Sequence, residues 1–281
     1  MSTLYLVSTP IGNLGDMSPR AGETLRSVDR ILAEDTRRSR PLAERAGSTA
    51  PLVSLHAHNE RERTAKVLAW LDAGEQLALV SDAGTPLVSD PGARLVEAVL
   101  DGGHRVVPIP GPSAVLAALV ASGFPTDRFT FLGFPERKGK DRVRLLERAA
   151  AADETVILFE SPNRLVELLD ALAERCAPDR RVAVARELTK LHEELVRGTL
   201  REASAYYSEH PPKGEVTLVL EPAPEVEAAA EDREDEARAL ATELLAGGMR
   251  PSQVARELAD RLDLARNDAY RIVHELGRDG D

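Results

Sequence analysis

Four loops contain most of the residues that could bind a ligand, and each follows a predicted strand. The segment 81–92, SDAGTPLVSDPG, is the richest of them in Gly, Pro, Ser and Asp. Gly84 allows unusual backbone angles, so a ligand could approach the main chain, and bare amides could bind a carboxylate or a nucleobase. The alternative is that 81–92 forms only two consecutive turns. Ser113 and Ala114 open a predicted helix, whose first amides attract negative or lone-pair-bearing groups.

The other two loops bear on which ligand could bind. The loop 9–13, TPIGN, follows the first predicted strand but lacks the G-x-G-x-x-G spacing of a dinucleotide site, which disfavours a nicotinamide cofactor. The loop 34–38, EDTRR, puts two carboxylates beside two guanidiniums at a strand end. This group is either a structural cluster of ion pairs or part of a functional site.

Histidine and cysteine positions predict no metal site. His56 and His58 would point to one face of a strand, but no third ligand is near them in the sequence. Cys176 is the only cysteine, which excludes an internal disulfide and a cysteine-cluster metal site. The start of the chain has no basic segment before its apolar residues, and no apolar run approaches the roughly 20 residues of a membrane span. We therefore expect a cytoplasmic protein without membrane association.

Alternating strands and helices must position these loops. Short apolar runs, each followed by a loop and a helical pattern, recur from residue 4 to about 220 and predict an α/β fold. A second series of strands begins near Phe129, so two lobes are expected. The tail contains three helical patterns, broken at Gly247-Gly248 and near Asp263, which are typical of a helix-turn-helix-like unit. The predicted parts are an N-terminal α/β lobe (1–115), a C-terminal α/β lobe (116–222), an acidic linker (223–236) and a helical tail domain (237–281).

Charge restricts how the chain could meet nucleic acid. The formal net charge is −11, which argues against broad, non-specific binding to phosphates. An RNA partner must therefore meet local basic patches, unless these residues are only solvated faces. The two patches are Arg37, Arg38 and Arg40, and Arg137, Lys138, Lys140, Arg142 and Arg144.

Seven segments share their order and spacing with a known family: Pro10 to Asn13, EDTRRSR, SDAGTPLVSDPG, PGPSA, FLGFPERKGK, ESPNRL and RELTKLHEE. Together they resemble the ribosomal small subunit methyltransferase I family of the tetrapyrrole methylase superfamily. The resemblance covers residues 3 to about 220, and the tail is similar to that family's helical domain. It implies a class III methyltransferase of two α/β lobes with S-adenosylmethionine, and no metal, in the cleft between them. It further implies a homodimer that methylates the 2′-hydroxyl of a cytidine in 16S rRNA of the small ribosomal subunit.

The resemblance also assigns residues to the cofactor site. In tetrapyrrole enzymes of the superfamily the third loop usually reads Gly-Asp-Pro, whereas this chain has Gly84-Thr85-Pro86, which favours the rRNA branch. The implied cofactor contacts are Pro10, Ile11, Gly12, Asp82, Ala83, Gly84, Thr85, Ser113, Ala114, Phe159 and Glu187.

Methyl transfer from a sulfonium is an in-line displacement that depends on positioning, and a base could remove the proton of a ribose hydroxyl as the bond forms. The candidate bases are Asp35, Glu160, Glu187 and Lys190. Glu187 and Lys190 would share one face if RELTKLHEE is helical, in which case an ordinary surface ion pair is the alternative. The candidates for contacts with the RNA backbone are Arg37, Ser161, Asn163, Arg164 and Arg186.

Three other functions remain open at this point. The first is methylation of a small-molecule tetrapyrrole, which would use the same cofactor cleft with another acceptor pocket. The second is a non-catalytic nucleotide- or RNA-binding module. The third is a magnesium-dependent nucleotide hydrolase using Glu34, Asp35 and Asp82, although these carboxylates lack a compact metal-ligand spacing.

Overall fold

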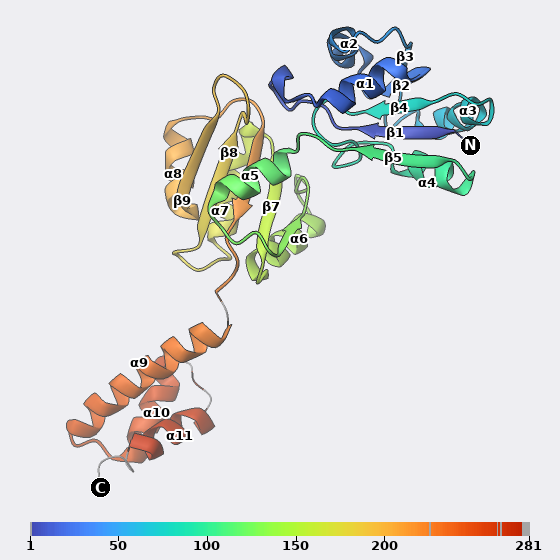
Figure 1. Ribbon diagram of the computed structural model, residues 1–281. Coiled ribbons are helices and arrows are strands. Elements are labelled where there is room, and N and C mark those ends of the chain that lie inside the picture. Colours follow the sequence, from blue (N-terminus) through green and yellow to red (C-terminus); the bar gives the residue numbers. More distant parts are fainter. Residues whose placement is uncertain (1, 225, 263, 265, 277–281) are drawn as a thin grey trace. The chain divides into compact units, whose positions relative to one another are not determined.

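The computed structural model describes residues 2–224, 226–262, 264 and 266–276. The chain divides into two compact units, Met1–Pro222 and Ala223–Asp281. The first unit contains two five-stranded sheets with helices on their faces, as the α/β prediction requires (Figure 1). No helix in the described part of the chain is both long and apolar enough to cross a membrane.

The first sheet is parallel throughout, in the strand order β3-β2-β4-β1-β5. Its strands are β1 (Thr3–Val7), β2 (Arg30–Ala33), β3 (Leu52–Ser54), β4 (Leu77–Val80) and β5 (Arg105–Ile109). Its helices are α1 (Pro19–Ser27), α2 (Thr36–Arg45), α3 (Glu60–Asp72) and α4 (Ala93–Asp101), and η1 (Leu14–Asp16) is a single 3-10 turn.

Helices pack on both faces of the first sheet, and the apolar side chains along its strands point alternately to the two faces. Leu4 and Leu77 belong to the core that includes side chains of α3 and α4. Val7 and Val80 belong to the opposite core, with side chains of α1 and α2 (Figure 1). Because both faces of the sheet are packed, the loops at its carboxyl end are held in fixed positions.

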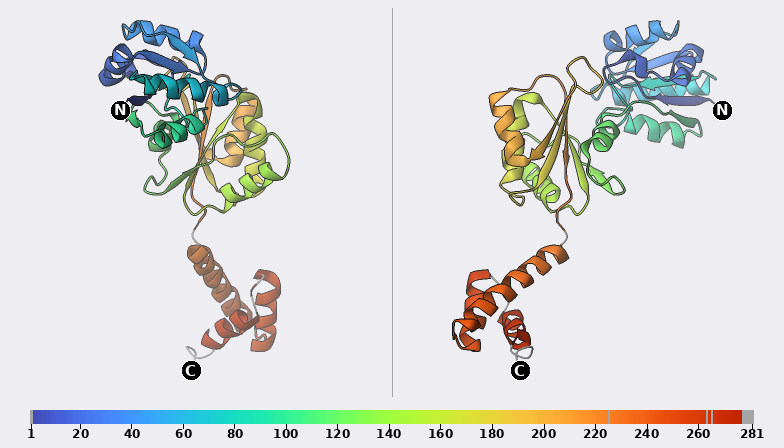
Figure 2. Two further views of the ribbon diagram at one scale, coloured as in Figure 1. Left: turned by 90° about the vertical axis from the view of Figure 1, so that its right-hand side faces the viewer. Right: turned by 60° about the vertical axis from the view of Figure 1, so that its left-hand side comes forward.

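The second sheet is mixed, in the order β6-β7-β10-β8-β9, with only the β6–β7 pair parallel. Its strands are β6 (Phe129–Phe131), β7 (Thr155–Glu160), β8 (Arg181–Arg186), β9 (Glu194–Thr199) and β10 (Val216–Leu220). Helices α6 (Lys140–Ala151), α7 (Leu165–Ala173) and α8 (Leu200–Glu209) contribute to the core on one face, and the 3-10 turn η2 (Pro162–Arg164) precedes α7. In Figure 2 the yellow-orange helix α8 runs along this face of the twisted strands.

Two sequence-based expectations for this lobe differ from the structure. Strand β9 was not predicted, because it lies at the sheet edge and is mostly half-exposed, so its apolar pattern is weak. The segment RELTKLHEE is not helical: β8 ends at Arg186, and Glu187 and Thr189 then have φ of 52° and 66°. The condition for a shared helical face of Glu187 and Lys190 is therefore not met, although the two side chains still meet within this turn.

Helix α5 (Ala114–Ser122) joins the two sheets. Its buried side chains Val115, Ala118 and Leu119 pack with Ile157 and other residues of the second sheet. The expected boundary between residues 115 and 116 therefore falls inside this helix, and by packing α5 belongs with the second sheet.

The described residues of the second unit form three helices, α9 (Val226–Ala246), α10 (Pro251–Leu262) and α11 (Arg266–Leu276). They share a core of small and aliphatic side chains, including Ala241, Leu258 and Ile272. Figure 2 shows the three helices, in orange to red, next to one another. Helix α9 begins at Val226, so most of the stretch 223–236 expected as a linker is helical. The break between α9 and α10 lies at Gly247-Gly248, as expected, whereas Asp263 itself lies outside the described residues.

Candidate functional site

The loops after β1, β4 and β5 meet at the carboxyl end of the first sheet, because these strands are neighbours. Thr9 and Gly84 exchange two backbone hydrogen bonds, with N···O distances of 2.8 and 3.0 Å. The Ser8 hydroxyl donates to the Thr85 hydroxyl (3.3 Å), which donates to the carbonyl of Pro112 (3.3 Å). These bonds tie the three loops together at the point where the sequence predicts a binding site.

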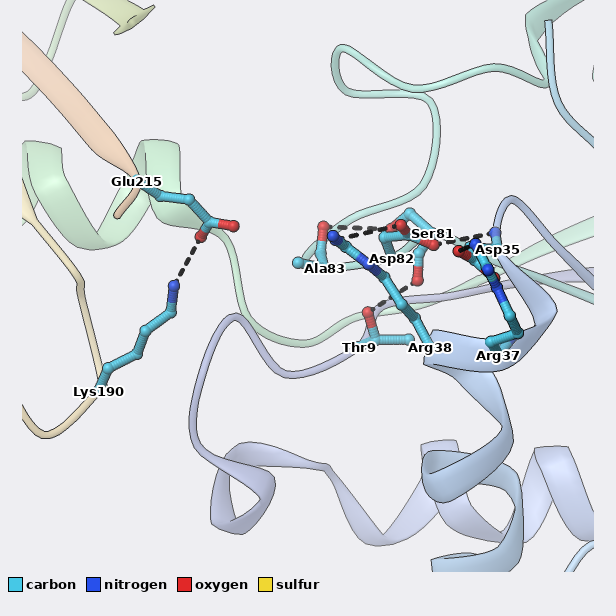
Figure 3. A network of polar contacts seen from close by, with 9 residues as sticks. All are labelled: Thr9, Asp35, Arg37, Arg38, Ser81, Asp82, Ala83, Lys190 and Glu215. Atoms are coloured by element: carbon cyan, nitrogen blue, oxygen red, sulfur yellow. Dashed lines mark hydrogen bonds and ion pairs between the residues drawn. The ribbon is translucent and has the colours of Figure 1, made fainter. Parts of the chain in front are cut away.

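The loop after β2 is attached to the same layer through Asp82. One oxygen of Asp82 accepts a hydrogen bond from the Asp35 backbone amide (3.0 Å), and the other lies 3.4 Å from Nη1 of Arg38 (Figure 3). Asp35 caps α2 by accepting from the Arg37 amide (2.9 Å) and also pairs with the Arg37 side chain. The Arg37 guanidinium and amide lower the pKa of Asp35 to about 2. Within the loop 34–38, Asp35, Arg37 and Arg38 therefore form ion pairs and hydrogen bonds that hold Asp82 in place.

Backbone strain is concentrated in two loops of this region. Among the described residues, the non-glycine positions with positive φ are Leu87 (73°), Ser89 (64°), Glu187 (52°) and Thr189 (66°). Such angles are costly for L-residues and persist only where surrounding contacts impose them, often at functional sites. The first pair follows β4 and the second pair follows β8, so both loops are candidates for a functional role.

A cavity of about 460 Å³ lies beside these loops, within the size range of small-molecule sites. It is lined by Ile11, Glu34, Arg38, Asp82, Ala83, Gly84, Thr85, Val88, Ser89, Asp90, Ser113, Ala114, Val115, Phe134, Phe159, Glu160, Ser161, Pro162, Gly214, Glu215, Val216 and Thr217. Both sheets therefore contribute to its wall. The Phe134 and Phe159 rings, 5.3 Å apart, add an apolar wall that could accommodate a flat ring.

The charges on the cavity wall are mainly negative. Five carboxylates line it, against the single guanidinium of Arg38. Burial, followed by the neighbouring charge of Glu34, raises the pKa of Asp90 to about 6. Burial and the charge of Asp82 also raise the pKa of Glu34. A cavity of this kind attracts a cationic ligand or one with several hydrogen-bond donors.

Glu160, at the end of β7, has a fully buried side chain. Its Oε1 atom accepts hydrogen bonds from the Ser161 amide (2.7 Å) and from Nε of Arg164 (2.7 Å). Arg164 also donates to the carbonyl of Pro135 (3.1 Å), which orients its guanidinium. This buried pair shapes the part of the wall formed by the carboxyl end of β7.

Glu187 supports the wall from behind without lining it. Its Oε1 atom accepts hydrogen bonds from Nζ of Lys190 (2.8 Å) and from the Glu215 amide (3.0 Å). Gly214 has φ of 83°, and a Cβ atom there would overlap the Glu187 carboxylate. Only glycine at 214 therefore lets Glu187 hold the segment that enters the cavity.

Lys190 connects this support to the first lobe. Its Nζ also lies 3.1 Å from Glu215 (Figure 3). Its aliphatic stem covers Gly12, where a Cβ atom would overlap it. Burial alone would lower the pKa of Lys190, but the hydrogen bonds to Glu187 and Glu215 raise it above its ordinary value.

Similarity to known proteins identifies the family. Residues 3–204 match the family of Tetrapyrrole (Corrin/Porphyrin) Methylases. A protein from Synechocystis named "Ribosomal RNA small subunit methyltransferase I" is 48% identical over the full length of both chains. One of the same name from Mesorhizobium japonicum is 47% identical over 97% of this chain and 92% of its own. This chain belongs to the ribosomal RNA small subunit methyltransferase I family. It is thereby a member of the tetrapyrrole methylases.

Solved structures share the fold of this chain at low sequence identity. Cobalt precorrin-4 methyltransferase is 18% identical, with a TM-score of 0.61 over 78% of this chain and 94% of its own. Diphthine synthase is 16% identical, with a TM-score of 0.60 over 79% of this chain and 90% of its own. The shared fold confirms the two-lobed tetrapyrrole-methylase architecture predicted from the sequence, with a helical unit after it.

The cavity brings together most of the residues that the family resemblance assigns to the cofactor. Eight of them line it: Ile11, Asp82, Ala83, Gly84, Thr85, Ser113, Ala114 and Phe159. Pro10, Gly12 and Glu187 do not line it, and the last two take part in the support around Lys190. Thr85, at the position where the superfamily usually has aspartate, acts as a cross-link between loops.

Of the four candidate bases, Glu160 lines the cavity, whereas Asp35, Glu187 and Lys190 lie outside its wall. Asp35 is occupied by Arg37, and its low pKa makes it a weak base. The pKa of Glu187 is lowered by the hydrogen bond from Lys190, and the raised pKa of Lys190 keeps its amine protonated. The geometry therefore favours positioning roles for these residues over proton abstraction.

The candidate RNA-binding residues are dispersed. Arg164 is engaged by Glu160, and Arg186 lies 3.0 Å from Glu194, so both guanidiniums are used inside the fold. Ser161 lines the cavity, and Asn163 is exposed. Arg37, with 89% of its side chain exposed, is the arginine of this set that is best placed to meet a phosphate.

Several lining residues were not assigned by sequence reasoning. Asp90 lies in the segment 81–92, which was recognised, but only folding brings it near Glu34. The segment Gly214–Thr217 was missed entirely, although a glycine directly before a buried strand could have indicated a close approach there. Among the described residues, no group of three or more His, Cys, Asp or Glu side chains could hold a metal ion.

Proposed function

We propose that this chain transfers a methyl group from S-adenosylmethionine, without a metal, to the 2′-hydroxyl of a cytidine in 16S rRNA of the small ribosomal subunit. The observation that carries the proposal is the acidic, partly aromatic cavity at the carboxyl end of the first sheet, in a chain of this methyltransferase family. S-adenosylmethionine bears a sulfonium, an ammonium and a flat adenine ring, and the wall offers carboxylates, bare backbone and phenylalanine rings to these groups.

The proposed cofactor contacts are the residues of the predicted set that line the cavity, from Ile11 through the loop Asp82–Thr85 to Ser113, Ala114 and Phe159. Gly84 lines the cavity without a side chain, and the first amides of α5 at Ser113 and Ala114 suit a carboxylate. Pro10, Gly12 and Glu187 support these contacts indirectly.

Methylation of a tetrapyrrole is the second candidate, because the similar folds include uroporphyrin-III-C-methyltransferase from Thermus thermophilus (20% identity, TM-score 0.56). Substrates of that type carry several carboxylates, which Glu34, Asp82 and Asp90 would repel. The relatives over the full length of the chain are named for ribosomal RNA, which favours the first candidate.

Transfer of labelled methyl groups tests the proposal directly. Small ribosomal subunits that lack the modification are incubated with labelled S-adenosylmethionine and no added metal, and nuclease mapping then locates the label. We expect one 2′-O-methylated cytidine in 16S rRNA. Label in an added tetrapyrrole instead would favour the second candidate, and absence of label from both would refute methyl transfer to either acceptor.

Arg37 is proposed to contact an RNA phosphate, and Arg37→Gln isolates that contribution. The substitution keeps the backbone amide of residue 37, which donates a hydrogen bond to Asp35, so the cap of α2 is retained. We expect weaker binding of the subunit, with the slope of log affinity against log salt reduced by about 1, and unchanged cofactor affinity. Arg61→Gln, at an exposed position on α3, is the matched control. Equal loss of cofactor and RNA binding in Arg37→Gln would contradict this division of roles.

The chain is also proposed to act in the cytoplasm as a homodimer. Leu116 and Val120, one turn apart on α5, are 51% and 72% exposed and give that helix an apolar outer face. Light scattering at micromolar concentration is expected to give twice the mass of one chain, and the mass of a single chain would refute the dimer.

A further inference from the structure

The carboxylates of the cavity differ in whether they are free to accept a proton. Both oxygens of Asp82 are engaged, by Asp35 and Arg38. Glu160 is buried against Arg164, and Glu215 pairs with Lys190. Within the described chain, Glu34 and Asp90 are the lining carboxylates without an ion pair.

Asp90 is also placed where an incoming hydroxyl could reach it. It is half-exposed and belongs to the strained loop after β4, in which Leu87 and Ser89 have positive φ. That loop brings Val88, Ser89 and Asp90 together onto the cavity wall, beside the residues proposed to hold the cofactor.

We propose that the Asp90 carboxylate is the general base that accepts the proton of the acceptor hydroxyl, with Glu34 tuning its basicity. This inference rests on the proposed methyl transfer. The hydroxyl oxygen forms a bond to the methyl carbon, and the carbon–sulfur bond breaks with its electron pair going to sulfur. The hydroxyl proton passes to Asp90 and is then released to solvent, so charge and atoms balance.

The electrostatic surroundings suit that task. Burial and the charge of Glu34 bring the pKa of Asp90 to about 6, while a hydrogen bond from Ser81 opposes the shift and Asp82 adds to it. Arg38 lines the same cavity and opposes the upward shift in the pKa of Glu34 that burial and Asp82 cause. A base with a pKa just below neutral is mostly ionised at pH 7 and still basic enough to take a proton.

Asp90→Asn is the primary test, measured as the single-turnover rate on saturating subunits and cofactor across pH. We expect the wild-type rate to rise with pH and to level off above an apparent pKa near 6. The variant should be roughly 100-fold slower at pH 7.5 and lose that rise, with the dissociation constant for S-adenosylmethionine changed less than about threefold. Asp90→Glu should restore the rise. Asp101→Asn, on the exposed end of α4, is the matched control and should behave as wild type.

Glu34→Gln tests the electrostatic role of Glu34, because a purely structural role of this residue would leave the midpoint of the pH–rate profile unchanged. Removing this neighbouring charge should shift the midpoint of the pH–rate profile to lower pH, because the repulsion that raises the pKa of Asp90 is lost. An unchanged midpoint would overturn the proposed tuning.

The folding of Asp90→Asn is checked by measuring its free energy of unfolding, and that of the wild type, as a function of pH. The pKa of Asp90 is raised from 3.8 to about 6, so the wild type loses stability as the pH rises through that window. Asp90→Asn does not lose stability in this way. It should have the higher free energy of unfolding at pH 8, and this difference from wild type should disappear below pH 4.

A rate equal to wild type in Asp90→Asn, or a loss of cofactor binding equal to the loss of rate, would overturn the inference. A wild type that methylates no RNA would instead refute the proposed function.

Discussion

Gly84→Val is expected to abolish useful cofactor binding, with the dissociation constant for S-adenosylmethionine raised on the order of 100-fold, or about 2.7 kcal/mol. Gly84 has φ of 80°, which a β-branched residue rarely adopts, and a Cβ atom there would lie 3.3 Å from Cγ2 of Ile11. The new side chain would crowd the loop that Thr9 holds through two backbone hydrogen bonds. Isothermal titration calorimetry with the cofactor measures the effect.

Gly103→Val is the control for backbone strain alone. Gly103 has a similar φ of 75°, but nothing lies within 4 Å of a Cβ atom built there. Both substitutions should lose roughly 1–3 kcal/mol of folding stability through the strained backbone, yet only Gly84→Val should lose the cofactor. Similar affinities in the two variants would show that Gly84 is needed for folding and not for the site.

Arg164→Leu is expected to lower the free energy of unfolding by about 3–5 kcal/mol, because it leaves the buried Glu160 carboxylate without its cationic partner. Urea denaturation measures this loss. Adding Glu160→Gln to Arg164→Leu should recover part of it, since the unpaired charge is then removed and only hydrogen bonds remain unmade.

Arg128→Leu provides the comparison with a surface pair. Arg128 lies 2.7 Å from Asp153, but both side chains are more than half exposed, so its removal should change stability little. If Arg164→Leu were as stable as wild type and lost only RNA binding, the role inferred for the Glu160–Arg164 pair would be wrong and the sequence-based assignment of Arg164 to RNA would stand.

Local patterns in the sequence were sufficient for the framework of the first lobe. Apolar runs such as 4–7 and 77–80 predict buried strands, because a parallel sheet covered on both faces must be apolar throughout. The composition of 81–92 indicated a ligand-binding loop, and Gly84 does adopt the positive φ that only glycine tolerates well. The edge strand β9 escaped prediction because edge strands bury less and their pattern is weaker.

Residue roles were harder to predict, because they depend on partners far along the chain. Asp35 and Arg164 look available in the sequence, yet Arg37 and Glu160 occupy them in the fold. A shared face of Glu187 and Lys190 would have required a helix, whereas the two side chains meet in a strained turn. In each case a short motif correctly marked the region but could not show which atoms remain free.

Local sequence patterns specify the α/β class, the family, the positions of the strands of the first sheet and most of the loops that surround the cavity. These follow from periodicity, glycine positions and motif spacing, which are properties of neighbouring residues. Folding of the whole chain is needed to bring Asp90 within the electrostatic influence of Glu34 and to place Gly214 on the cavity wall against Glu187. Burial and charge–charge repulsion act through space. The pKa of Asp90 is raised first by burial and then by Glu34, which follows another strand, so the shift arises only once the chain has folded.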